Sequence, residues 1–341
     1  MEAATPPDGT IPGIVEWDGG IRLSGTSLWL DARRPVPLSF LSSALVFHRH
    51  QRIIASAQTL EILGARLGSS EVLPSPFRRP FSVGELVLEL LPAGQVPGSA
   101  LLLVRKGELT VLYCGGVRLG RSLVAEPCQV PRADVLVLDC PYDEPPYDFP
   151  TQKRAVEDLT SWIRGVIAQG ETPLLLAGEL GMAQEVCQLL SAEGLPTRVH
   201  RHIATVNRRV RTAGIPLARV PALRDPASAG EVVVAPLRAS GSTLLRRLVP
   251  RARVALVSGR AAAPGAVEHA GAEKGFAWSC NADGKDLRQV VRDSGARHVY
   301  LGARHSGRFE AGLKRLGLGV TRLAESEEGS QLDLFDGGRT E

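Results

Sequence analysis

The feature that most limits how this chain can fold is a set of short segments built almost entirely from apolar residues. Val135–Leu138 is one of them, and Pro173–Ala177 and Val232–Ala235 lie further along. A strand with one face in water alternates apolar and polar residues, so such runs predict strands buried on both faces. Helix-length segments, such as Gln152–Gln169 and Met182–Glu193, separate the later runs. This alternation predicts a parallel sheet covered by helices.

The first third of the chain predicts β-structure interrupted by one helix. Ala57–Leu67 has helical spacing because Leu60, Leu63 and Leu67 fall on one face, and Gly68 ends it. The expected strands are short and are separated by turns. They are Ile14–Trp17, Ile21–Leu23, Ser27–Asp31, Ala44–Phe47, Arg52–Ala55, Leu86–Leu91, Ala100–Arg105 and Leu109–Tyr113.

The chain beyond residue 196 predicts further strands and helices. The expected strands are Thr197–Arg201, Arg253–Ser258, Phe276–Ser279, His298–Leu301 and Gly319–Leu323. The expected helices are Gly241–Leu248, Lys285–Ser294 and Arg308–Leu316. From Ala324 onward the chain is mostly Glu, Ser, Gly and Asp, a composition that predicts a disordered tail.

Length and composition are typical of a globular protein. The 341 residues are 44% hydrophobic and 22% charged, which supplies a core without disulfide or metal staples. No segment approaches the roughly 18 consecutive apolar residues of a membrane span. The acidic, Pro-rich start is unlike a signal peptide, so we expect a cytoplasmic protein with no membrane partner. Five cysteines without a CxxC pair predict reduced thiols rather than disulfides or a thiolate zinc site.

Six segments follow one another in an order that is informative. They are Leu28–Asp31 with Pro35 and Val36, Ile53–Leu60 with Arg66–Gly68, Pro92–Ala100, Tyr113–Gly116, Leu138–Tyr142 and Ser279–Asp283. In this order they resemble the metallo-β-lactamase-fold nucleases with a β-CASP insert, above all the bacterial exonuclease-like branch found beside DNA ligases. The resemblance implies an α/β fold, a metallo-β-lactamase-like αββα sandwich with an inserted β-CASP-like parallel α/β domain. It implies a sandwich from 1–140 and 263–323, an insert at 141–262, and a tail at 324–341.

The chemistry of that family is not carried over with the motifs. Its members hold two divalent ions with histidine and carboxylate ligands, which activate water and clamp the phosphate. Here the matching positions are occupied mostly by residues that are poor ligands, and only two keep a carboxylate. These vestigial positions are Ser43, Leu45, Gln95, Gly116, Asp139, Asn281, Asp283 and Ala303. We therefore expect no catalytic residues, no metal and no cofactor.

Two histidine pairs leave an alternative open. His48 and His50 follow the degraded first motif, and His200 and His202 follow an expected strand. Either pair could be surface histidines in a basic neighbourhood, and the second could face phosphate. The alternative function is a metal-dependent DNA or RNA exonuclease with a rearranged site that uses Asp139 or Asp283 with the first pair.

The tail carries the most specific functional signal in the sequence. Five consecutive residues match the QL[S/D]LF pentapeptide with which bacterial polymerases and repair proteins bind the sliding clamp. They are Gln331, Leu332, Asp333, Leu334 and Phe335. The glutamine can form hydrogen bonds through both ends of its amide, and the leucines and phenylalanine can fill apolar pockets. The other interpretations are a stray apolar stretch in a disordered tail and a segment that docks on its own domain like a final strand.

The charge balance suggests a second partner. The net charge is +4, and only five of the 40 basic residues are lysine. Arginine suits bidentate contacts with phosphate, although a GC-rich genome gives the same bias. The candidate DNA-binding residues in the insert are Arg208, Arg209, Arg211, Arg246 and Arg247, which could also be a solvated helix surface.

These features together predict a catalytically inactive nuclease-fold protein of DNA replication or repair. Its expected partners are the bacterial DNA polymerase sliding clamp and DNA, and other repair proteins are open. A module that binds proteins without contacting DNA is a further hypothesis.

Overall fold

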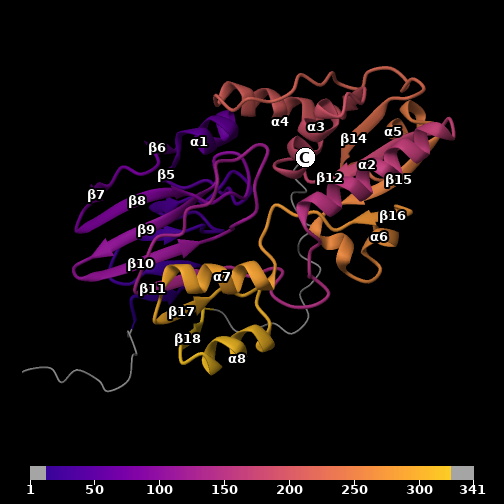
Figure 1. The fold of residues 1–341 in the computed structure, drawn as a ribbon. Helices are drawn as coiled ribbons and strands as arrows, with labels where there is room; N and C mark the ends of the chain where they lie inside the picture. Colours follow the sequence, from indigo (N-terminus) through magenta and orange to yellow (C-terminus); the bar gives the residue numbers. More distant parts are fainter. Residues whose placement is uncertain (1–12, 324–341) are drawn as a thin grey trace, which may run out of the picture.

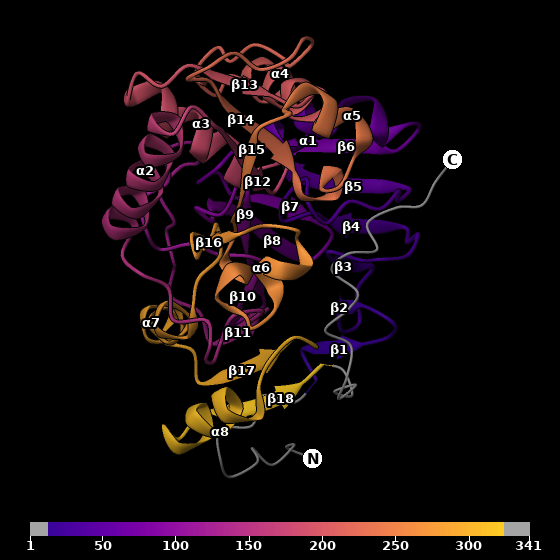
Figure 2. The same ribbon diagram turned by 90° about the vertical axis from the view of Figure 1, so that its right-hand side faces the viewer.

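The computed structural model describes residues 13–323, whose strands form three sheets (Figure 1 and Figure 2). The clamp-type peptide predicted at Gln331–Phe335 lies outside the described residues. Within the described range, no helix is both long enough and apolar enough to cross a bilayer.

Six strands form the first sheet, in the order β1-β2-β3-β4-β5-β6. The pairs β3–β4, β4–β5 and β5–β6 are parallel, whereas β2 is antiparallel to both β1 and β3. The bounds are β1 (Val15–Trp17), β2 (Ile21–Leu23), β3 (Leu28–Leu30), β4 (Leu38–Phe40), β5 (Arg52–Ser56) and β6 (Glu71–Ser75).

Seven strands form the second sheet, in the order β18-β17-β11-β10-β9-β8-β7. They are β7 (Phe81–Val83), β8 (Leu86–Pro92), β9 (Ala100–Lys106), β10 (Leu109–Cys114), β11 (Val135–Leu138), β17 (His298–Leu301) and β18 (Gly319–Arg322). β11 lies between two parallel neighbours, β10 and β17, and all four of its residues are buried. The prediction that this apolar run is a strand covered on both faces is confirmed.

Apolar side chains on the facing surfaces of these two sheets form one core. Phe40 of β4 meets Tyr113 of β10 edge to face, with ring centroids 6.2 Å apart. The outer face of the first sheet is covered by α1 (Ala57–Leu63), which continues into η1 (Gly64–Leu67), and that of the second by α7 (Gly284–Ser294) and α8 (Gly307–Arg315). The four layers are the predicted αββα sandwich.

The third sheet is wholly parallel and has the order β13-β14-β12-β15-β16. Its strands are β12 (Thr172–Ala177), β13 (Thr197–Val199), β14 (Val232–Pro236), β15 (Ala252–Val257) and β16 (Lys274–Phe276). Because β17 and β18 then return to the second sheet, this unit is inserted into the sandwich, as predicted. Its last strand lies beyond residue 262, where the sequence places the end of the insert, and the domain limits themselves stay a prediction.

Helices cover both faces of the inserted sheet. One face carries α2 (Gln152–Ala168), α3 (Met182–Ala192) and α4 (Arg201–Thr212), and the other carries α5 (Thr243–Leu248). Shorter elements are η2 (Leu237–Ala239), η3 (Gly259–Ala262) and α6 (Ala266–His269). α4 also packs against α1, so one apolar cluster continues from the sandwich into the insert (Figure 1).

Three expected strands are wrong in type or extent. Ala44–Phe47 is a turn that leaves Leu45 51% exposed, because β4 takes the place beside β5. β13 ends at Val199, and His200 begins α4 as its N-cap. β16 ends at Phe276 because the backbone N–H of Trp278 turns back to the carbonyl of Phe276. Local hydrophobicity gave no sign of these boundaries.

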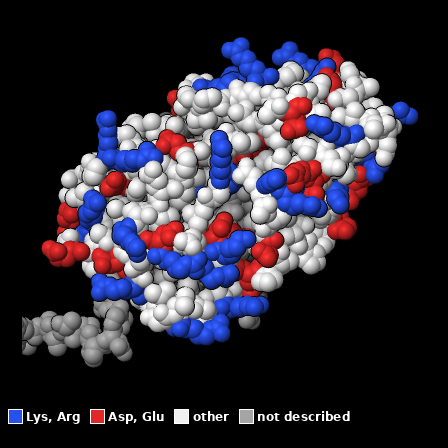
Figure 3. Space-filling model, viewed as in Figure 1, with Lys and Arg blue, Asp and Glu red and all other residues white. Residues whose placement is uncertain are grey.

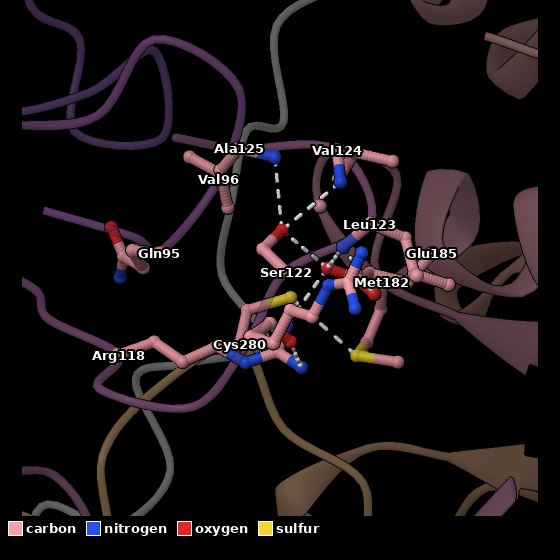
Figure 4. Close-up of polar contacts among 12 residues, drawn as sticks. Gln95, Val96, Arg118, Ser122, Leu123, Val124, Ala125, Met182, Glu185 and Cys280 are labelled. Carbon is pink, nitrogen blue, oxygen red and sulfur yellow. Dashed lines mark hydrogen bonds and ion pairs between the residues drawn. The ribbon is translucent and has the colours of Figure 1, made fainter. Parts of the chain in front are cut away.

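A buried ion pair fastens the insert to the sandwich. Arg118, in the loop after β10, lies 2.8 Å from Glu185 of α3, and both side chains are almost fully buried. The same carboxylate accepts hydrogen bonds from Ser122 Oγ at 2.6 Å and from the backbone N–H of Leu123 at 3.1 Å (Figure 4). Because the buried charge is paired and its other lone pairs are occupied, the loop 118–123 is held in one position against α3.

Glu185→Ala is expected to destabilise the protein by about 3–5 kcal/mol, because it leaves the Arg118 charge buried without its partner. Urea unfolding measures the loss. Glu193→Ala is the matched control, since it breaks the exposed Arg164–Glu193 pair and should cost about 1 kcal/mol or less. Equal losses in the two variants would contradict a special role for the buried pair.

Candidate functional site

The candidate site lies where several strands of the sandwich end side by side. Asp31 follows β3, Gly116 follows β10, Asp139 follows β11 and Ala303 follows β17. β10, β11 and β17 are parallel neighbours, so their carboxyl ends meet at one edge of the sheet. The structure therefore brings together residues that the sequence matched to the family's ligand positions.

An arginine neutralises the one ligand-type carboxylate at the centre of this edge. The guanidinium of Arg304 donates two hydrogen bonds to Asp139: Nε lies 3.3 Å from Oδ1, and Nη2 is bonded to Oδ2. Burial disfavours the charge of Arg304, but the adjacent carboxylate outweighs burial and raises the pKa of the guanidinium. The sequence analysis missed Arg304. The sequence feature that could have indicated it is a basic residue three positions after β17, the strand that pairs with β11, after which Asp139 lies.

The two positions that match later histidines are joined to each other. Gln95 Nε2 donates to Asn281 Oδ1 at 2.7 Å, although the residues are 186 positions apart. A Cβ atom on Gly116 would lie 2.2 Å from Gln95 Nε2, so a carboxylate side chain there would displace the amide. The amide pair and the glycine are thus compatible with each other and not with a bridging aspartate.

Asp31 is held in a small hydrogen-bonded group beside this pair. Its Oδ1 accepts from the backbone N–H of Ser42 at 2.7 Å, and its Oδ2 accepts from Ser42 Oγ at 2.5 Å and Tyr113 OH at 2.8 Å. Burial outweighs these bonds and raises the pKa of Asp31 to about 6. Gly115 is required here, because a Cβ atom would lie 2.3 Å from Asp31 Oδ2.

The remaining vestigial residues have structural roles or face solvent. Asp283 caps α7, accepting from the backbone N–H groups of Lys285 and Asp286 at 3.1 and 3.0 Å. Ser43 is buried, and its hydroxyl accepts from the backbone N–H of Leu45 at 3.4 Å. Ala303 is exposed. None of these side chains is arranged around a common centre with Asp139.

The histidine pairs do not form metal sites in the described structure. His48 is exposed, whereas His50 is buried with neither ring nitrogen partnered among the described residues. The rings of His200 and His202 stack with centroids 5.2 Å apart, at the N-terminus of α4. Within residues 13–323, no group of three or more His, Cys, Asp or Glu side chains is placed to hold a metal ion.

A two-metal centre does not fit the residues at the strand ends. Its bridging position is a glycine packed against an amide, and its histidine positions are an amide pair. Asp139 is paired with a cation, because Arg304 bonds to both of its carboxylate oxygens. A divalent ion would have to displace the Arg304 charge, which costs the ion pair and adds repulsion between cations.

The candidate DNA-binding arginines lie in two separate groups. Arg208, Arg209 and Arg211 belong to α4, and Arg246 and Arg247 belong to α5, on the opposite face of the inserted sheet. The structure does not bring the two groups together.

Further cations and an aromatic ring join the α4 group. The guanidinium of Arg66 lies over the ring of Phe47, 5.0 Å from its centroid. Burial lowers the pKa of Arg66, and the nearby charge of Arg209 lowers it further. Arg66 has no carboxylate within 4 Å among the described residues. Unpaired arginines and an aromatic ring at the α1–α4 contact are suited to phosphate and base contacts.

The chain is similar over almost its whole length to a protein named probable DNA ligase from Opitutus terrae. The identity is 29% over 332 residues, covering 95% of this chain and 32% of that protein. A second relative, named RNase aCSPSF2, from Saccharolobus solfataricus, is 26% identical over 121 residues, which is 35% of this chain and 24% of that protein. The chain spans about a third or less of the length of these relatives. No family model matches the sequence.

Among solved structures, the fold is similar to a protein of unknown function from Enterococcus faecalis. The TM-score is 0.53 at 12% identity, covering 77% of this chain and 74% of that one. Such a match bears on the fold alone. With the described sandwich and insert and the RNase-named relative, it agrees with the α/β metallo-β-lactamase-like fold that the sequence predicts.

Asp31→Asn is expected to change how stability depends on pH. The pKa of Asp31 rises from 3.8 to about 6 on folding, so its contribution is complete below about pH 4 and is lost as the pH rises through about 6. The wild type should therefore lose up to about 3 kcal/mol relative to Asp31→Asn across that window. Urea unfolding at a series of pH values measures the difference.

The control for this prediction has the opposite sign. Hydrogen bonds from Thr110 lower the pKa of Asp134, so Asp134→Asn should be less stable than the wild type at neutral pH. That difference should shrink as the pH falls through the lowered pKa, below about 4. Parallel pH profiles for wild type and Asp31→Asn would contradict the prediction.

Proposed function

We propose that this chain is a catalytically inactive nuclease-fold protein that acts in DNA replication or repair in the cytoplasm. In this proposal the peptide Gln331–Phe335 tethers it to the sliding clamp, and arginines of the insert contact DNA. The observation that carries it is the Arg304–Asp139 ion pair, in which an arginine occupies the one ligand-type carboxylate at the centre of the strand-end site.

Several residues at the strand-end site, not Asp139 alone, support the loss of catalysis. The ion pair, the Gln95–Asn281 amide pair and Gly116 replace ligands with groups that satisfy one another. Hydrolysis by a two-metal mechanism needs ions that generate the nucleophile and stabilise the leaving oxygen. No described group supplies either role at this edge.

The DNA part of the proposal draws on the relatives and on charge. One relative is named as a DNA ligase and another as an RNase, so a role in nucleic-acid metabolism is the common element. Arg209 of α4 lies close enough to Arg66 to lower its pKa, and α1 packs against α4, so these two cations lie together at the junction of sandwich and insert. The α5 pair would be a second contact on the opposite face.

The clamp part of the proposal rests on sequence. All five residues of the pentapeptide match the clamp-binding pattern, and three of them are large apolar residues within a polar stretch. Such residues are expected to be buried by a partner.

Leu334→Ala/Phe335→Ala is expected to reduce binding to the bacterial sliding clamp at least tenfold, because it removes two apolar anchors that would fill pockets on the clamp. Surface plasmon resonance with the full chain measures the change. Ser326→Ala/Thr340→Ala, which alters the tail outside the pentapeptide, should bind as the wild type does. Equal affinity of the pentapeptide variant and the wild type would refute the tether.

Arg208→Glu/Arg209→Glu is expected to weaken binding to duplex DNA at least tenfold and to reduce its dependence on salt, since each lost phosphate contact lowers the log–log slope by about 0.9. Fluorescence anisotropy over a salt series measures both. Arg246→Glu/Arg247→Glu tests the second group in the same way. Unchanged affinity in both variants would leave the protein-binding module as the better description.

A further inference from the structure

A groove lies between α7 and α8, and Asp143, four residues after Asp139, is among the residues that line it. It has a volume of about 520 Å³ and is bounded by α7, α8 and the segment 143–148. Pro145, which is exposed, and Tyr147, which is half-buried, form one wall. On the side of α8, Phe309 and Leu313 are buried, whereas Leu316 is not. Leu316 is 66% exposed, the largest exposure among the exposed large hydrophobic residues of the described chain. The groove therefore offers apolar surface that nothing in the described structure covers.

Cations line the same groove. Arg288 of α7 and Arg308 and Arg315 of α8 are exposed, and none has a carboxylate within 4 Å among residues 13–323. Figure 3 shows basic side chains over α7 and α8 on this face of the molecule, with acidic side chains among them. Three acidic residues also line the groove, Asp143, Glu144 and Asp148. Asp143 accepts from the backbone N–H of Ser306 at 2.6 Å, and Asp148 lies 3.8 Å from Lys285 Nζ, so two of the three are already engaged. Apolar surface with unpaired arginines at its rim is suited to a peptide that is both acidic and apolar.

The chain itself supplies such a peptide close by. Residues 324–341 contain six acidic residues and one basic residue, and Leu332, Leu334 and Phe335 lie among them. The last described residue, Leu323, follows β18 and bonds to the carbonyl of Leu301 at 2.9 Å. Arg322, next to it, pairs with Glu310 of α8 at 2.6 Å. The undescribed segment thus begins beside the helix that forms one wall of the groove.

The connection is long enough to reach. Eight residues separate Leu323 from Leu332, and at about 3.3 Å per residue they span up to about 26 Å. Helix α8, with nine residues, is only about 14 Å long at 1.5 Å per residue. Because the peptide is attached, its effective concentration at the groove is of millimolar order, so weak contacts are sufficient.

We propose that the segment Glu325–Asp336 docks in the α7–α8 groove of the free protein, with Leu332, Leu334 and Phe335 against Pro145, Tyr147 and Leu316 and the acidic residues toward the arginines. The docked segment is unavailable to any other partner. This inference rests on the proposed function only in one respect: if the segment also binds the clamp, the two sites compete for the same residues.

The first test does not involve the clamp. A fluorescent peptide spanning Glu325–Asp336 is titrated onto the full chain carrying Leu332→Ala/Leu334→Ala/Phe335→Ala, which vacates the groove. We expect saturable binding that Arg288→Glu/Arg308→Glu weakens at least tenfold. The charge-matched control is Arg79→Glu/Arg224→Glu, at exposed arginines outside the groove, and it should have little effect.

Three outcomes of that titration would overturn the proposal. They are no saturable binding, equal binding of a scrambled peptide of the same composition, and displacement of the peptide by a short DNA duplex. The scrambled peptide would reveal attraction by charge alone, and the duplex would show that phosphate is the groove's ligand. Thermal melting of each variant verifies that the exposed substitutions leave the fold intact.

The second test measures competition. In the otherwise unaltered full chain, Arg288→Glu/Arg308→Glu should raise the affinity for the sliding clamp at least threefold, because the peptide is released from the groove. Unchanged affinity would overturn the masking role. If neither the wild type nor Arg288→Glu/Arg308→Glu binds the clamp, the proposed tether is refuted. The peptide titration then still decides whether the segment docks in the groove.

Discussion

The arrangement of the whole molecule depends on the contact between the sandwich and its insert. A continuous apolar cluster runs from α1 into the helices and inner face of the inserted sheet, and the Arg118–Glu185 pair is buried beside it. The apolar contact buries surface between the two units, whereas the ion pair fixes their relative position. It does so because a buried charge is stable only in the arrangement in which it is paired. The same loop places Gly116 and the site edge on one side and α3 on the other. Arg66 and Arg209 lie together only because the insert is fixed in this orientation.

The polar side chains of the strand-end site form hydrogen bonds with one another. Asp139 is paired with Arg304, Gln95 with Asn281, and Asp31 with Ser42 and Tyr113. A buried polar group without a partner is costly, so these pairs stabilise the edge of the sheet. In the proposed function they stand where nucleases of the related fold would hold their metal ions. The neighbouring surfaces, rather than this edge, then become the candidates for function.

Charge is distributed so that different surfaces suit different partners. The α4 group and Arg66 lie at the junction of sandwich and insert, and the α7–α8 groove is bounded by those two helices and the segment 143–148. One cationic surface is suited to the phosphate backbone, and the other combines cations with exposed leucine. An acidic and apolar C-terminal segment is suited to the second. In the two proposals together, the C-terminal segment binds either the α7–α8 groove or the sliding clamp. Its docking in the groove would therefore control whether the protein is tethered to the clamp.

The sequence alone determined the elements whose signal is local. The apolar run Val135–Leu138 is a buried strand in any parallel sheet, and the order of motifs was sufficient for the sandwich with its insert. It was also visible that most positions matched to the family's ligands hold neither histidine nor carboxylate, since side-chain chemistry does not depend on the fold. Tertiary structure alone decided what replaced the ligands, because Gln95 meets Asn281 across 186 residues and Arg304 reaches Asp139 only through strand pairing. It also separated the α4 and α5 arginines, which the sequence had grouped, because an inserted sheet has two faces and local sequence does not specify which face each helix covers.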